Sequence, residues 1–356
     1  MRVPSFRYLA PATVAEAARI LREEGPGAKL LAGGTDLVPN MKRRQQVPST
    51  LVALRKVDGL RGVAGGGAQE LRLGAGVTLA ALAREPRLGA PLRALAVAAG
   101  KVATAQIRNQ ATIGGNLCLD TRCNYYNQNY EWRQAIDFCK KAPAPGGTAQ
   151  LVVQPQGTCW VAPSSPRCWA VSSSDTAPAL IALGAEVTLV SAEGERRLPL
   201  QALYQDDGMD YLARRPDELL TEVLVPAHAP GWRSTYWKLR RRGSFDFPVL
   251  GVAAALRLEG GVVAEARLCL GAVASHPVSV PTDELVGQPL TDEVIAAFVA
   301  RAAKPARPLD NTDYHLSWRK RMATAYLTGA LRELRGDPPE ALGLLARTAA
   351  RLPVLA

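Results

Sequence analysis

The stretch Lys29-Leu30-Leu31-Ala32-Gly33-Gly34-Thr35-Asp36-Leu37 has an apolar run before a double glycine and the start of a second apolar run after it. The first run predicts a strand over 29–32, and the residues from Leu37 predict a helix. A glycine turn at this junction leaves backbone N–H groups beside a helix N-terminus, an arrangement that attracts phosphate. Ala32 to Asp36, called here the first glycine segment, is therefore a candidate phosphate site.

A second double glycine lies in Thr112-Ile113-Gly114-Gly115-Asn116, which follows an alanine-rich stretch that predicts a helix from about Pro91 to Ala103. Neither glycine segment has the G-x-G-x-x-G spacing, so a Rossmann fold is not predicted. Each double glycine taken alone also fits a plain turn, and that alternative stays open. As a pair, the two segments predict a clasp around a diphosphate.

The remaining pattern alternates between helical and strand periodicity, which predicts a mixed α+β fold. Thr13 and Glu16 form a capping-box pattern before a helix that Gly25-Pro26 ends. Further elements are expected as helices at 78–82, 172–183, from 292 and over 313–334, and as strands at 51–54, 70–73, 185–190, 218–225, 235–240, 249–258 and 262–270. A linker at 226–230 predicts a domain boundary, and the residues from 338 predict a further helix.

Between Cys118 and Cys168 the chain loses this periodicity and contains five cysteines among Tyr, Asn, Pro and Gly residues. This composition predicts an insertion that is held together by something other than an apolar core. Structural zinc sites usually pair cysteines as C-x2-4-C, a spacing that Cys123, Cys139, Cys159 and Cys168 do not have, although zinc stays an alternative. Cys269 lies in an apolar strand pattern that is typical of a buried core thiol.

The formal net charge of +11 arises from 43 Lys and Arg residues against 32 Asp and Glu residues. Such an excess suits anionic cofactors, acidic partners or nucleic acid, and it is also compatible with a simply solvated surface. No recognised nucleic-acid motif accompanies the charge, so no nucleic-acid partner is expected. No apolar run predicts a signal peptide or a membrane span, and we expect a cytoplasmic protein.

Three segments in order carry a resemblance to a known family: Leu30 to Leu37, Ala111 to Leu117, and Ser174-Asp175-Thr176-Ala177-Pro178-Ala179-Leu180. They resemble the FAD-binding subunits of the xanthine dehydrogenase and carbon monoxide dehydrogenase family. Lys238 to Arg242, followed by Phe245-Asp246-Phe247, resembles the start of the C-terminal flavoprotein domain of that family.

The resemblance implies an α+β fold in which a non-Rossmann FAD-binding domain of two subdomains spans 1–225. An iron-sulphur insertion is expected at about 119–170, a C-terminal domain of a three-stranded sheet plus helices at 231–335, and a tail at 336–356. By family position, Asp175 would lie on the adenosine or ribityl side of FAD, and Lys238 near the flavin ring. From the residues alone, Asp175 also fits a helix cap and Lys238 a solvated side chain. The residues expected to hold the FAD diphosphate are Leu31, Ala32, Gly33, Gly34, Thr35, Asp36, Thr112, Ile113, Gly114, Gly115 and Asn116.

Within the insertion, Asp120 to Gln128 resembles the corresponding loop in flavin subunits of 4-hydroxybenzoyl-CoA reductases. That resemblance implies a 4Fe-4S cluster on Cys123, Cys139, Cys159 and Cys168, with Pro143 to Gly147 as added loop. Cys118 follows the second glycine segment so closely that it is left out of the cluster.

The same resemblance implies an oxidoreductase subunit with a molybdenum-cofactor large subunit, a 2Fe-2S small subunit and a ferredoxin-like electron donor as partners. Its expected role is to pass electrons between the 4Fe-4S cluster, FAD and the partner centres, for reductive dehydroxylation of 4-hydroxybenzoyl-CoA. Two alternatives stay open. One is a hydroxylating molybdenum dehydrogenase that passes electrons outward to NAD or another acceptor, and the other is a zinc-stabilised basic binding module.

Overall fold

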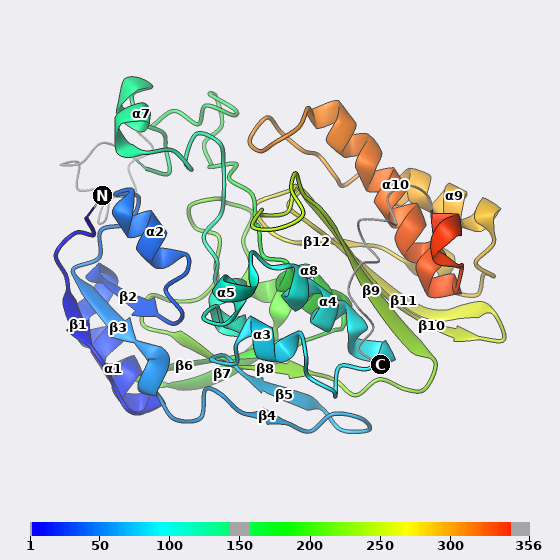
Figure 1. Cartoon of the computed structure of the whole chain (residues 1–356), viewed down its shortest axis with the longest axis horizontal. Coiled ribbons are helices and arrows are strands. Elements are labelled where there is room, and N and C mark those ends of the chain that lie inside the picture. The colour runs from blue at the N-terminus through cyan, green and yellow to red at the C-terminus, as the bar shows by residue number, and fades with distance from the viewer. Residues whose placement is uncertain (1, 143–156, 343–356) are drawn as a thin grey trace.

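Three β-sheets with helices between and against them make up the chain, as a computed structural model shows for residues 2–142 and 157–342 (Figure 1). The expected loop at Pro143 to Gly147 and most of the expected C-terminal tail lie outside these described residues. The α+β class predicted from the sequence is confirmed. Short 3-10 turns connect the elements at η1 (Gly25–Gly27), η2 (Leu54–Lys56), η3 (Ala90–Leu92), η4 (Leu200–Leu203), η5 (Asp283–Leu285) and η6 (Pro339–Leu342).

The first sheet is parallel and has the strand order β1 (Arg7–Leu9), β3 (Thr50–Ala53), β2 (Ala28–Leu31). Helix α1 (Val14–Glu24) packs its apolar side, which includes Ala17 and Leu21, into the core beside this sheet. It begins where the Glu16 N–H donates to the Thr13 side chain and ends at Gly25, as predicted. Strand β2 leads through the first glycine segment into α2 (Leu37–Lys42).

The second sheet is antiparallel and has the order β4 (Val63–Ala64), β5 (Leu71–Gly74), β8 (Leu219–Val225), β6 (Glu186–Ser191), β7 (Gly194–Pro199). The sequence pattern predicted β5, β6 and β8 but not the two edge strands. β7 was missed because its residues are mostly exposed and polar, so no apolar alternation marks it.

The third sheet contains the three predicted strands, β9 (Trp232–Leu239), β10 (Leu250–Glu259) and β11 (Val262–Gly271). A short edge strand that the pattern did not predict, β12 (Val278–Val280), pairs with β11. Helices α9 (Asp292–Ala302) and α10 (Leu316–Arg335) pack against this sheet, in a core that contains Leu256, Phe298 and Leu327. These two helices were also predicted.

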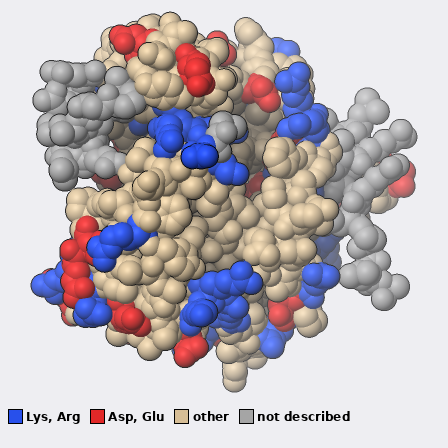
Figure 2. All heavy atoms as spheres, turned by 60° about the vertical axis from the view of Figure 1, so that its left-hand side comes forward, with Lys and Arg blue, Asp and Glu red and all other residues tan. Residues whose placement is uncertain are grey.

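The surface carries its basic excess unevenly. On the face drawn in Figure 2, Lys and Arg side chains gather in separate patches within a mostly uncharged surface. Among the described residues, no helix combines the length and the apolar character that crossing a membrane requires.

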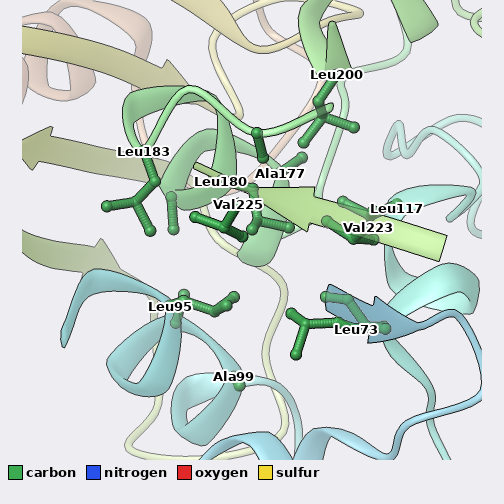
Figure 3. Close-up of a cluster of buried hydrophobic side chains, with 14 of the residues drawn as sticks. Leu73, Leu95, Ala99, Leu117, Ala177, Leu180, Leu183, Leu200, Val223 and Val225 are labelled. Carbon is green, nitrogen blue, oxygen red and sulfur yellow. The ribbon is translucent and has the colours of Figure 1, made fainter. Parts of the chain in front are cut away.

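A layer of helices joins the second sheet to the third: α3 (Leu79–Leu82), α4 (Arg93–Lys101), α5 (Ala105–Arg108), α6 (Ile113–Leu117) and α8 (Thr176–Ala182). Figure 3 shows part of their shared core, where Leu95, Leu117 and Leu180 point toward Leu73 and Val223 of the second sheet. α8 is shorter than the predicted 172–183 helix: Val171 and Ser172 donate backbone hydrogen bonds to the distant Arg122 and Ala274 carbonyls, and the helix begins only at Thr176. The second glycine segment and the residues Ser174 to Thr176, which precede Ala177, therefore adjoin one core.

The insertion contains one short helix, α7 (Tyr130–Ala135), in its described part and is otherwise irregular. Its two ends are joined by a pair of backbone hydrogen bonds of 2.8 Å between Arg122 and Val171. This pairing returns the chain to the helix layer just before Ser174.

Candidate functional site

The first glycine segment offers unbonded backbone donors. Within residues 2–142 and 157–342, the N–H groups of Gly33, Gly34, Thr35 and Asp36 make no hydrogen bond. Gly34 has φ 71°, a left-handed conformation that glycine adopts without strain. Every residue from Leu31 to Asp36 is half-buried, so the segment lies at the surface and can be covered by a ligand.

The two glycine segments lie side by side because a glycine permits their contact. A Cβ on Gly33 would stand 2.0 Å from the carbonyl oxygen of Gln110, just before the second segment. Gly115 is exposed, and a Cβ built there would stand 3.9 Å from the Cβ of Ala32. The structure thus brings together the two segments that the sequence analysis paired.

The second glycine segment is the first turn of α6, not the open turn that the sequence predicted. The Gly115 N–H donates to the Thr112 side chain at 3.1 Å, and the Asn116 N–H donates to the Thr112 carbonyl at 2.9 Å. The Ile113 and Gly114 N–H groups donate to carbonyls of the loop after β5, each at 2.9 Å. These four donors are therefore already satisfied within the protein, unlike those of the first segment.

Asn116 links the second segment to the segment before α8. Its buried Oδ1 accepts hydrogen bonds from the Ser174 hydroxyl at 2.8 Å, the Thr176 hydroxyl at 2.6 Å and the Thr176 N–H at 3.3 Å. These bonds fix the position of the Asp175 backbone between Ser174 and Thr176.

Asp175 is fully buried and does not cap α8, since its side chain makes no capping bond. Its carboxylate accepts a hydrogen bond from Tyr236 at 2.8 Å and pairs with the Lys238 ammonium at 2.8 Å. Lys238 is buried as well and donates to the Lys101 carbonyl at 3.0 Å. The two simpler interpretations, a helix-capping Asp175 and a solvated Lys238, are therefore wrong.

Burial dominates the electrostatics of this pair. It raises the pKa of Asp175, although the adjacent Lys238 ammonium opposes the change, and it lowers the pKa of Lys238. Burial, together with the charge of Arg240, also lowers the pKa of Lys101 to about 8. Removing either member of the pair would leave an uncompensated buried charge. The sequence contained no signal for Tyr236 or Lys101, because neither belongs to a recognisable motif.

The four cysteines that the sequence grouped do lie together. Cys123, Cys139, Cys159 and Cys168 are buried and border one cavity, called here the thiol cavity, with Tyr126, Lys141 and Trp160 among its other lining residues. Cys118 does not line it and instead packs against the helix-layer core. Cys269 is buried in β11, as the strand pattern indicated.

Burial favours the protonated form of Cys123, Cys139 and Cys168. It raises the pKa of Cys123 to about 12 and that of Cys168 to about 11, and it also raises the pKa of Cys139. Nearby Arg133 and Lys141 oppose this change at Cys139. In the part of the chain that the structure describes, no group of three or more His, Cys, Asp or Glu side chains is arranged to hold a metal ion.

The insertion is attached directly to the segment around α2. Arg122 is buried, forms an ion pair with Asp36 and donates to Asn40 Oδ1 at 3.1 Å. Gln46 donates to Asp120 at 3.0 Å, and Arg133 donates to the Arg43 carbonyl at 2.5 Å. The insertion is thus bound to the residues that follow the first glycine segment, a link that sequence reasoning missed because Arg122 lies 86 positions from Asp36.

Comparison with protein-family models shows the family to which this chain belongs. The family model described as the FAD binding domain in molybdopterin dehydrogenase matches residues 4–228. The chain belongs to this flavoprotein family. A second model, the CO dehydrogenase flavoprotein C-terminal domain, matches residues 234–334, which include the third sheet and its two helices.

Relatives of this flavoprotein match it over most of their length. The aldehyde oxidoreductase FAD-binding subunit PaoB of Escherichia coli K12 is 34% identical over 277 residues, 77% of this chain and 83% of the relative. The carbon monoxide dehydrogenase medium chain of Hydrogenophaga pseudoflava is 28% identical over 333 residues, 92% of this chain and 96% of the relative. A solved carbon monoxide dehydrogenase from that organism, which lacks the Mo-pyranopterin moiety, superposes with a TM-score of 0.73 at 27% identity, covering 93% of this chain and 98% of that one.

Proposed function

We propose that the two glycine segments hold FAD through its diphosphate, with Leu31 to Asp36 on one side and Thr112 to Asn116 on the other. The observation that supports this proposal best is the row of unbonded N–H groups from Gly33 to Asp36 in a half-buried segment. These groups donate hydrogen bonds to phosphate oxygens. The second segment forms the opposite wall of the site and donates no hydrogen bond to the phosphates, because its own N–H groups are already bonded within the protein. Its exposed Gly115 leaves room beside Ala32.

Asp175 and Lys238 support this site from behind it. Their side chains are only 3% and 1% exposed, which favours a positioning role over direct contact with FAD. The pair holds the start of α8 to β9 and, through the Lys101 carbonyl, to the end of α4. Bound FAD supplies a group that exchanges one or two electrons.

We also propose a division into an FAD-binding domain at 1–225, which contains the insertion, and a C-terminal domain at 231–335.

The thiol cavity is proposed to hold a 4Fe-4S cluster on Cys123, Cys139, Cys159 and Cys168. Four cysteine thiolates are the usual ligand set of such clusters, and Lys141 and Arg133 place positive charge near the negative charge of the ligands. The cavity is about 20 Å³, so the thiols must move outward to admit a cluster. Zinc is the competing occupant, and structural zinc sites usually pair cysteines as C-x2-4-C, a spacing that these four cysteines do not have.

The chain is then an electron-transfer subunit of a molybdenum hydroxylase-type complex, with a molybdenum large subunit and a 2Fe-2S small subunit. Electrons from a ferredoxin-like donor pass through the insertion and FAD to the partner centres, for reductive dehydroxylation of 4-hydroxybenzoyl-CoA. What supports the reductive direction is the cysteine insertion, whose first loop at Asp120 to Gln128 resembles that of reductases acting on this substrate.

A second candidate is favoured by the names of the relatives. The aldehyde oxidoreductase and carbon monoxide dehydrogenase chains are named for oxidising enzymes. A chain of the same kind would pass electrons outward to NAD or another acceptor. Copurified complex should distinguish the two: turnover of 4-hydroxybenzoyl-CoA with a low-potential donor supports the first, and substrate-dependent reduction of NAD supports the second.

The cofactor assignment is tested on anaerobically purified full-length chain by measuring FAD, iron, sulphide and zinc. Serine at any of the four cavity cysteines should lower iron and sulphide, whereas Cys118→Ser and Cys269→Ser, the matched controls, should retain both. Gly115→Phe should lower flavin content without lowering iron. Zinc in place of iron in the wild-type chain would overturn the cluster, and full flavin in Gly115→Phe would overturn the placement of FAD.

A further inference from the structure

A second, larger cavity lies between the third sheet, α9 and the end of the insertion. It is a groove of about 590 Å³, called here the basic groove. Val273, Val278 and Phe298 contribute an apolar floor. This volume lies within the range of functional binding sites in proteins. The proposed roles of FAD and the cluster do not use this groove.

The groove has an excess of positive charge that its own carboxylates do not balance. Asp206 pairs with Arg167 at 2.6 Å and lies 3.2 Å from His276 Nδ1, and Glu284 pairs with Arg301. Lys304 and Arg307 also line the groove and are exposed. Neither makes an ion pair within the described ranges. Two cations are thus left to attract an anionic partner.

The basic groove and the thiol cavity share one wall. Arg167 and Trp169 line the groove, whereas Cys168 and Ala170 line the thiol cavity. This alternation is what an extended backbone produces, since successive side chains point to opposite sides. Only one stretch of chain therefore separates the groove from a cysteine that is proposed to ligate the cluster.

We propose that the basic groove is the docking surface for an acidic electron-carrier protein that exchanges electrons with the cluster behind Cys168. This inference rests on the proposed function, because it requires the cluster. Asp206 and Glu284 neutralise Arg167 and Arg301, whereas Lys304 and Arg307 are exposed and make no ion pair within the described ranges, so these two charges act over distance on a large acidic surface. A small anion would instead need free donors that converge inside the cavity.

Each encounter moves one electron: the reduced carrier is oxidised and the cluster is reduced. Two encounters and two protons from solvent suffice to reduce FAD fully. Docking at the groove places the carrier beside the wall that contains Cys168, and exposed rim charges of this kind mainly raise the rate of encounter.

The test measures binding of a small acidic ferredoxin, in its oxidised form, to the full-length chain by calorimetry at low and high salt. The double variant Lys304→Glu and Arg307→Glu should weaken binding at least about tenfold and reduce its salt dependence. The double variant Arg55→Glu and Lys56→Glu, which reverses two exposed charges that line neither cavity, is the matched control and should bind like the wild type. Reduction of each chain by dithionite, which needs no docking, should be unchanged.

Three outcomes would overturn the docking surface: no binding of ferredoxin to the wild-type chain, unchanged binding in the Lys304→Glu and Arg307→Glu variant, or equal weakening by the control variant Arg55→Glu and Lys56→Glu. Failure of the proposed function has a different signature. If the purified chain lacks iron and still binds ferredoxin through Lys304 and Arg307, the docking surface is supported and the proposed cluster is wrong.

Discussion

The two glycine segments look alike in sequence but differ in what their backbone does. Gly33 to Asp36 leave four N–H groups without a hydrogen bond in the described structure, whereas Ile113 to Asn116 have all four of theirs bonded. The glycines have correspondingly different functions. Gly33 and Gly114 permit close backbone packing, Gly34 permits a left-handed turn, and Gly115 leaves an exposed face open. A pair of glycines therefore does not by itself identify the donor of a phosphate contact.

The segments also differ in how they are held. The first is held from outside, by the ion pair between Asp36 and Arg122 of the insertion. The second is held from within the core, by Asn116 and its bonds to Ser174 and Thr176. Variants in these residues should therefore separate flavin binding from stability.

The largest effect is expected from Gly33→Val, which would push the two segments apart. Its Cβ would stand 2.0 Å from the Gln110 carbonyl oxygen, a backbone atom that cannot move aside alone. We expect a loss of at least about 3 kcal/mol in FAD binding, roughly a hundredfold in affinity, measured by flavin fluorescence titration. Gly62→Val is the control, since a Cβ there meets nothing within 4 Å. Equal affinities for the two variants would show that the close approach is unnecessary.

Asn116→Leu should lower stability next, by roughly 2 to 3 kcal/mol, because it leaves the Ser174 and Thr176 donors buried without their acceptor. Urea unfolding of the chain measures this change. Asn109→Leu alters an exposed asparagine nearby and serves as control. If both variants unfold at the same urea concentration as the wild type, Asn116 does not hold the second segment.

A smaller effect is expected from Arg122→Met, which removes the contact between the insertion and the first segment. We expect FAD affinity to fall by about 1 to 2 kcal/mol, since Asp36 loses its buried partner and the adjoining turn is less well held. Arg122→Lys should recover part of this loss. The iron content distinguishes the mechanism: FAD loss with iron retained supports the proposed contact, whereas loss of iron first would assign Arg122 to the folding of the insertion.

The smallest effect is expected from Thr112→Val, which removes the side-chain acceptor for the Gly115 N–H. Loss of such a cap costs about 1 kcal/mol of stability. Without this acceptor, the Gly115 N–H is free to donate to a phosphate oxygen of FAD. FAD should therefore protect this variant against thermal unfolding more than it protects the wild type. Equal protection would show that the second segment does not approach the phosphates.

Sequence alone determined the elements whose signals are local. The cap at Thr13, the stop at Gly25, the strand before the first glycine segment and the three long strands of the third sheet all follow from residues within a few positions of each other. The resemblance of the glycine segments likewise needed only short motifs, and the family comparison agrees with it. The edge strands β7 and β12 were not predicted, because exposed or very short strands carry little apolar pattern.

Only the tertiary structure decided which backbone donors stay free and which charged groups are buried. Asp175 and Lys238 are 63 positions apart, and they meet only because α8 packs on the third sheet. The N–H groups of the second segment are satisfied by the loop after β5, which no motif in the segment reveals. Local sequence limits the conformations of a few neighbouring residues, whereas burial and hydrogen-bond satisfaction depend on what distant segments bring into contact.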